Sequence, residues 1–212
     1  MPISETWTSR LQDTLAVRRR VPMFFPVDRG GSVATQVLRE LLCHGAEELA
    51  LGRATQVHVE VTTDGAFVVE DDGVGVDGAP QPDGELSVLE RVVLSLHAGC
   101  RHERALAAVR ERVCQASLAA AATRATSFVV DSRVGGRHWR FELKDGVPVS
   151  PPVLVGPADT QGLRLTHRPD RDLIGDAPPD LDALRAWWDE LGLAFVQGRL
   201  HIEQQPRPAA SD

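Results

Sequence analysis

Two kinds of hydrophobic spacing run along the chain, and each predicts a different element. Leucines recur at helical spacing over residues 32–51, between a serine suited to helix capping and a glycine suited to helix termination, which predicts one long helix. Valine alternates with polar residues over 56–62, which predicts a strand with one buried face. Asp64-Gly65 then predicts a tight turn into a second strand at 66–69. The domain therefore begins with a helix and a hairpin.

The rest of the chain continues with the same two patterns. Further helices are predicted at 85–97 and 181–191, and one long helix or two abutting helices at 103–123. Further strands are predicted at 126–134, 137–143, 162–167 and 200–203. Because the strands form hairpins and do not alternate strictly with helices, the pattern predicts an α+β fold, a two-layer sandwich of helices on a sheet. We expect a basic, proline-bounded N-terminal arm at 1–31, a single domain at 32–204 and a flexible tail at 205–212.

Composition narrows the class of protein. The chain has 212 residues, of which 42% are hydrophobic and 25% charged, which suits one domain with a real core and excludes a disordered, collagen-like or disulfide-scaffold protein. The net charge of −7 argues against general DNA binding. Three cysteines without metal-type spacing favour a reducing compartment, and no apolar run or N-terminal pattern indicates a membrane span or signal peptide, so we expect a cytoplasmic protein.

Two short polar clusters could carry chemistry. They are the helix residues Glu40, His44 and Glu47, and the residues Asp71, Gly73 and Gly75 that follow the second predicted strand. A carboxylate in a cleft can orient or deprotonate a water, and glycines after an aspartate let the backbone approach a flat ligand. Taken by themselves, the two clusters fit a solvated helix face and an ordinary turn better than a functional site.

The order of several motifs resembles the ATPase domain of DNA gyrase B and its topoisomerase IV counterpart, in the GHKL superfamily. The similar segments are AVRRRVPMF at 16–24, RELLCHGAEE at 39–48, VEDDGVG at 69–75, KDGVP at 144–148, GLRLTHRPD at 162–170 and the closing helix and strand at 184–204. They are similar to the family's AVRKRPGMY, EVVDNxxDE, VxDDGRG, EHGVP and GTxVxFxPD motifs and to its last helix and strand. The resemblance implies the Bergerat fold, a mixed and largely antiparallel sheet covered on one face by helices.

The resemblance also implies roles for individual residues. Glu40 falls at the general base that activates the water attacking the γ-phosphate of ATP, and Asp71 at the acceptor for the adenine amino group. The other matches to the nucleotide pocket are Glu47 at an acidic position, Gly73 and Gly75 in the adenine-side loop, and Arg140 beside the pocket mouth. ATP and magnesium are the cofactors that the family would use.

Several family residues are replaced. His44 stands at the magnesium-binding asparagine, where an imidazole suits an oxygen-preferring cation poorly and is only a weak metal candidate. Leu163 replaces the adenine-side threonine and Val74 replaces an arginine, so the pocket loses polar partners. The family's glycine-rich lid should fall near 109–115, where this chain has no glycine and a helix is expected instead of a phosphate-binding loop.

These replacements favour a degenerate relative, a binding or regulatory module with lost or weak binding of ATP and magnesium and no ATPase activity of its own. One alternative is an ATP-binding protein with slow hydrolysis, in which Glu40 is the base and Asp71 recognises adenine. A second alternative is a pocket that binds another small molecule.

The family's transducer and cleavage domains are expected to be missing, so topoisomerase activity is not expected of this chain alone. A protein partner, with gyrase-like subunits as candidates, fits better than DNA or a membrane, and a homodimer stays open.

Overall fold

One mixed sheet of eight strands forms a layer of the structure, a computed structural model that describes residues 18, 32–82, 85–95, 118–191 and 199–205. The strands are β1 (Gln56–Val61), β2 (Phe67–Asp71), β3 (Ala125–Val134), β4 (Arg137–Lys144), β5 (Val147–Pro148), β6 (Val153–Pro157), β7 (Gly162–Pro169) and β8 (Arg199–Gln204). Their order is β5-β4-β3-β7-β2-β1-β8, and β6 pairs with β4 beside this path. The β1–β8 pair is parallel, and the other strand pairs are antiparallel. The mixed, largely antiparallel sheet is confirmed.

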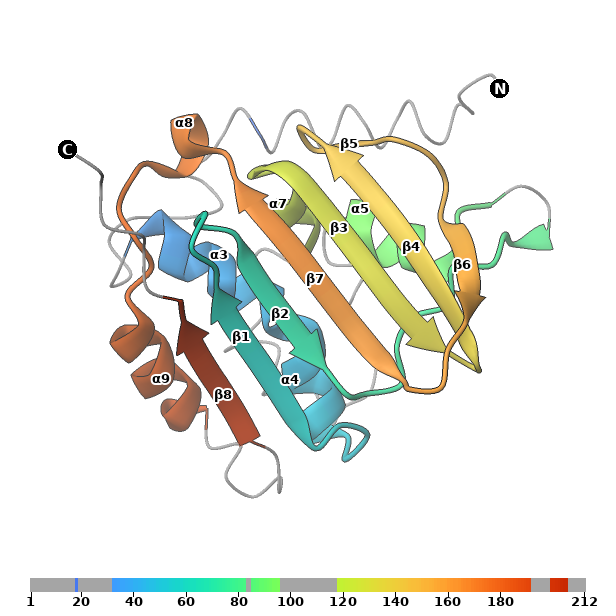
Figure 1. The fold of residues 1–212 in the computed structure, drawn as a ribbon, viewed down its shortest axis with the longest axis horizontal. Coiled ribbons are helices and arrows are strands. Elements are labelled where there is room, and N and C mark those ends of the chain that lie inside the picture. The colour runs from blue at the N-terminus through green and yellow to red at the C-terminus, as the bar shows by residue number, and fades with distance from the viewer. Residues whose placement is uncertain (1–17, 19–31, 83–84, 96–117, 192–198, 206–212) are drawn as a thin grey trace.

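Helices cover one face of this sheet. They are α3 (Val33–Leu41), α4 (Cys43–Ala50), α5 (Val88–Leu94), α7 (Leu118–Ala122), α8 (Arg171–Ile174) and α9 (Leu181–Glu190). In Figure 1, α3, α4, α5 and α7 lie behind the sheet, while α9 lies beside β8 at its edge. The predicted α+β sandwich of two layers is therefore confirmed.

The first helical segment is divided at Leu42. The Ser32 hydroxyl caps its start by accepting a hydrogen bond from the Thr35 N–H at 3.3 Å. Leu42 separates α3 from α4, whereas the sequence predicts one helix over 32–51. The break is slight, because Leu42 keeps a right-handed helical conformation and its N–H still bonds to the Leu38 carbonyl.

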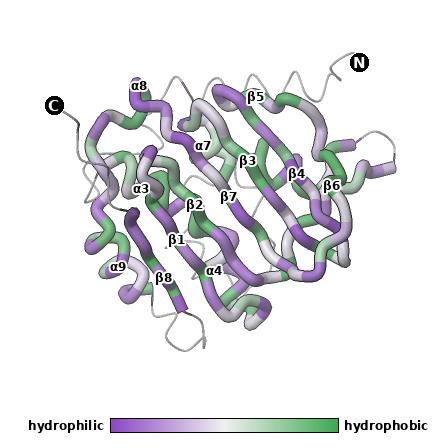
Figure 2. The backbone as a smooth tube through the Cα atoms, viewed as in Figure 1, coloured by the Kyte–Doolittle hydropathy of each residue, from purple (hydrophilic) through white to green (hydrophobic). Residues whose placement is uncertain are grey.

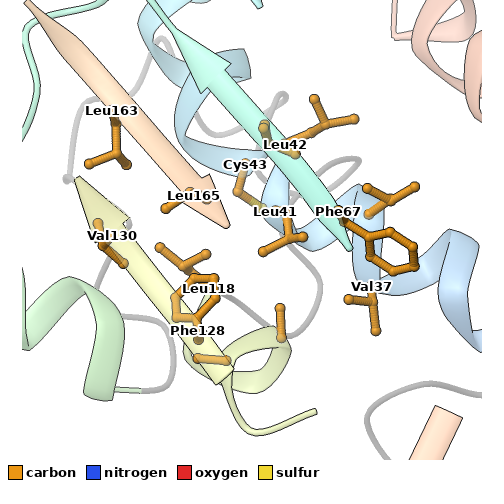
Figure 3. Packing of buried hydrophobic residues seen from close by; sticks show 14 of the residues in the cluster. Val37, Leu41, Leu42, Cys43, Phe67, Leu118, Phe128, Val130, Leu163 and Leu165 are labelled. Carbon is orange, nitrogen blue, oxygen red and sulfur yellow. The ribbon is translucent and has the colours of Figure 1, made fainter. Parts of the chain in front are cut away.

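The core lies between the helices and the inward face of the sheet. Val57, Val59 and Val61 of β1 are buried, as the alternation predicts, while their neighbours in the strand are more exposed. Figure 3 shows leucines of the first helical segment packed towards Phe67 of β2 and Phe128 of β3. This packing places the polar residues of α3 and α4 next to the inward side of the sheet.

The outward face of the sheet is polar and carries ion pairs between strands. Glu70 on β2 pairs with Arg164 on β7, with an Nη1–Oε2 distance of 2.6 Å, and also with Arg133 on β3. Figure 2 shows hydrophilic residues recurring along the strands. The sheet therefore separates an apolar helix side from a charged outer side.

The other predicted elements differ mainly in length. Both predicted hairpins and the helix at 181–191 are confirmed, and the helix expected at 85–97 is observed at 88–94. Of the helix expected at 103–123, the described part forms α7, and the remainder lies outside the described residues, as do the tail from 206 and the arm except for Arg18. Strands β5 and β6 and helix α8 were not predicted. Within the described ranges, no helix has the length and apolar character needed to cross a bilayer.

Candidate functional site

The two predicted polar clusters meet on the inward side of the sheet. Nδ1 of His44 on α4 lies 2.9 Å from Oδ2 of Asp71, at the end of β2. Gly45 allows this approach, because a Cβ atom at this position would lie only 2.6 Å from Cγ2 of Val57. A close helix–sheet contact thus places the imidazole against the carboxylate.

Both oxygens of the Asp71 carboxylate are engaged within the chain. Oδ2 bonds to the His44 ring, and Oδ1 accepts a hydrogen bond from the Gly73 N–H at 3.0 Å. Asp71 is 4% exposed and the His44 side chain is 14% exposed. The imidazole and the Gly73 N–H therefore each occupy one oxygen of a buried carboxylate.

The charges around His44 favour its protonated form. Burial by itself lowers the pKa of the His44 imidazole, but Asp71, Glu48 and Glu47 outweigh it and raise that pKa above 6.5. Since a carboxylate only accepts, Nδ1–H must donate to Asp71. The described residues offer no other hydrogen bond to this ring, so Nε2 is the atom left to meet a ligand.

Glu48, which the sequence patterns did not single out, holds the loop after Asp71. Its Oε2 atom accepts a hydrogen bond from the Val74 N–H at 3.2 Å and another from Nε of Arg53 at 3.0 Å. Gly75 has a φ of 77°, and a Cβ there would lie 2.5 Å from the Arg133 carbonyl oxygen. Glu48 is the last residue of the RELLCHGAEE motif, and this position was the feature of the sequence that could have identified it. The loop glycines thus serve close packing whether or not a ligand binds.

Glu40 and Glu47 are buried on the same helical segment, at 5% and 7% exposure. Oε2 of Glu40 lies 3.7 Å from Sγ of Cys43. The structure records Cys43 as disulfide-bonded, and the other two cysteines of the chain lie outside the described residues. Cys43 is therefore oxidised, whereas the number and spacing of the cysteines predict reduced thiols.

Proteins similar to this chain were found by sequence and by structure. DNA gyrase B of Thermus thermophilus is 27% identical over 177 residues, covering 80% of this chain and 28% of that protein. DNA gyrase B of Myxococcus xanthus is 26% identical over 199 residues, covering 92% of this chain and 24% of that protein. A crystal structure of the 43K ATPase domain of Thermus thermophilus gyrase B with an aminocoumarin matches with a TM-score of 0.70 and 23% identity, over 92% of this chain and 49% of that one.

The chain is similar to DNA gyrase B in sequence and to its ATPase domain in fold. No protein-family model matches it. The gyrase B-like domain spans about a quarter of the length of the curated gyrase B proteins that it matches. The crystal structure supports the fold, and the gyrase B sequences support the relationship.

Leu163 and Arg140, which the sequence analysis assigned to the pocket of the gyrase B-like domain, lie in surroundings that differ from each other. Leu163 on β7 is 1% exposed and is the register partner of Asp71, so an apolar side chain stands where the family has a threonine. Arg140 on β4 points to the outward face, because Trp139 and Phe141 point inward, and its Nε lies 2.8 Å from Oδ1 of Asp131. Asp131 also raises the pKa of the Arg140 guanidinium. This position corrects the expectation that Arg140 lies beside the pocket.

The metal and lid expectations have different outcomes. Among the described residues, no group of three or more His, Cys, Asp or Glu side chains is arranged to hold a metal ion. His44 bonds to Asp71 through Nδ1, which leaves magnesium binding a prediction without a ligand set. The lid segment at 109–115 lies outside the described residues.

Proposed function

We propose that this gyrase B-like domain is a degenerate relative that acts as a binding or regulatory module with lost or weak ATP binding. The observation that carries the proposal is the His44–Asp71 hydrogen bond at 2.9 Å. In the family, the corresponding aspartate receives the adenine amino group. Here the imidazole already donates to it, so adenine would have to share or displace a charge-assisted hydrogen bond.

The surroundings of the pair support the same function. The Gly73 N–H occupies the second Asp71 oxygen, and Leu163 supplies no polar atom beside it. A buried hydrogen bond to a charged group contributes about 1.5–3 kcal/mol, which corresponds to roughly tenfold or more in affinity. Loss of this amount from the adenine contact suffices to weaken nucleotide binding strongly.

The retained Glu40 supports the alternative of an ATP-binding protein with slow hydrolysis. Glu40 is buried at 5% exposure on the same helical segment as His44, where the family has its general base. A base without a bound nucleotide has no reaction to serve. Nucleotide affinity therefore separates this alternative from the degenerate module.

A different small molecule is the second alternative, and His44 specifies its chemistry. With Nδ1 donating to Asp71 and the pKa of the ring raised, the protonated Nε2 offers a hydrogen-bond donor in place of a carboxylate acceptor. Such a site fits a carbonyl oxygen better than an amino group. An oxo-purine or a similar flat ligand would satisfy it.

The test is isothermal titration with a non-hydrolysable ATP analogue, with and without magnesium. We expect no binding to the wild-type chain at about millimolar ligand, where Kd values near 1 mM become measurable. His44→Asn restores the family residue and releases one Asp71 oxygen, so this variant should bind at least about tenfold more tightly. The gain should disappear in the His44→Asn/Asp71→Ala double variant.

His58→Asn is the matched control, because His58 lies on the outward side of β1, with Nε2 3.7 Å from Glu203. It should leave nucleotide affinity unchanged. Tight, magnesium-dependent binding to the wild type that Asp71→Ala removes would overturn the proposal and favour the ATPase. Absence of binding in both the wild type and His44→Asn would direct the search to a protein partner, with gyrase subunits as the first candidates.

A further inference from the structure

Strand β6 presents apolar side chains at an edge of the sheet. Val153, Leu154 and Val155 are 55%, 51% and 53% exposed, and Val149 just before them is 65% exposed. With Val147, they are five of the six exposed large hydrophobic side chains among the described residues. The hydrophobic colour of β6 at the sheet edge can be followed in Figure 2. The unpaired backbone N–H and C=O groups of an exposed apolar edge strand form a template for pairing with another strand.

The segment around β6 is also uncharged. Residues 147–157 read VPVSPPVLVGP and contain no acidic or basic side chain, in a chain with 30 acidic and 23 basic residues. Two copies of a chain with a net charge of −7 repel each other over most of their surfaces. This neutral segment is a place where two copies can approach without opposing like charges.

The sequence of β6 is nearly symmetric about Leu154. In an antiparallel pairing of two copies centred on Leu154, Val153 of one copy faces Val155 of the other. Pro151 and Pro157 then face each other and end the ladder, because proline has no N–H to donate. The pairing that this pattern favours is therefore short and has twofold symmetry.

We propose that β6 is a self-association edge, at which two copies of this chain pair antiparallel about a twofold axis through Leu154. The same residues then contribute to both sides of the contact, as twofold dimers require. Five partly exposed side chains cover less than the roughly 800 Å² per partner of a stable interface. We therefore expect a weak dimer, with a Kd on the order of 100 micromolar. The proposal does not depend on the state of the nucleotide pocket.

Sedimentation equilibrium over a concentration series up to about 1 mM tests this proposal, since that range spans the expected Kd. The wild type should shift from monomer to dimer. Leu154→Lys places two ammonium groups against each other on the axis and should weaken the dimer at least about tenfold. Gln204→Lys, an exposed position on the other edge strand β8, is the matched control and should dimerise like the wild type.

A cross-linking experiment checks the geometry. In the proposed dimer, Leu154→Cys brings two thiols together on the axis, so mild oxidation should produce a covalent dimer that Gln204→Cys does not. The unfolding midpoint of each variant establishes that it is folded. The proposal is overturned if the wild type stays monomeric to about 1 mM, if Leu154→Lys dimerises normally, or if Gln204→Lys weakens the dimer equally.

Discussion

His167 is held neutral by the residues around it. Its ring is fully buried, stacks on Phe67 with centroids 5.7 Å apart, and donates from Nε2 to the Ala121 carbonyl at 3.0 Å. Burial lowers the pKa of this imidazole from 6.5 to about 4. His167 is therefore protonated more readily in the unfolded chain than in the folded chain, so the free energy of unfolding depends on pH.

Folding stability should fall as the pH decreases from about 6.5 to about 4, because the unfolded chain binds a proton at His167 and the folded chain does not. The maximum loss is about 3 kcal/mol. Urea unfolding at several pH values measures it. His167→Gln keeps an N–H donor without titrating, so its stability should depend less on pH over this window; equal dependence in both proteins would contradict the prediction. His44 contributes with the opposite sign, because its raised pKa gives stability that is lost as the pH rises. This contribution is present in both proteins, so the effect of His167 is the difference between the wild type and His167→Gln.

At the scale of the element, the start of strand β7 requires a glycine. Gly162 has a φ of 131°, and a Cβ atom there would lie 2.0 Å from the carbonyl oxygen of Asp71 on β2. No side chain fits between these strands. The approach of β7 to β2 also sets Leu163 opposite Asp71. One backbone contact therefore supports both the sheet and the candidate site.

Gly162→Ala should destabilise the fold by about 3 kcal/mol or more, from backbone strain plus the clash with β2. Gly52→Ala is the matched control, because Gly52 also has a positive φ of 67° but has no atom within 4 Å of the added Cβ. That control should cost about 1–2 kcal/mol from strain alone. Denaturant unfolding compares the two, and equal losses would contradict a tight β2–β7 contact.

At the scale of the whole molecule, Cys43, on the helix segment that carries Glu40 and His44, is disulfide-bonded. The wild type should therefore have one reactive thiol of its three cysteines when unfolded without reductant, and three after reduction. Reduction should lower stability by about 2–4 kcal/mol. A thiol count under both conditions measures the bond, and three thiols without reductant would show that Cys43 is free.

Local patterns in the sequence predicted most elements of the fold. Both hairpins, the α9 helix and β7 follow from residue alternation, helical spacing and turn glycines, which act between neighbours in the chain. The pairing of β6 with β4 was not predicted, because a short run of valines between prolines has no helical or alternating period. The break between α3 and α4 at Leu42 was not predicted either, because no helix-terminating residue marks it in the sequence.

The sequence by itself determined which residue types occupy each motif and in which order the elements follow. The tertiary structure decided which atoms meet. His44 and Asp71 are 27 residues apart, and the packing of Gly45 against Val57 brings the imidazole onto the carboxylate. Arg140 has a family-like position in the sequence, but strand alternation turns it to the outward face, towards Asp131. Hydrogen-bond partners depend on side-chain direction and on distances between elements, and these are set only when the layers pack.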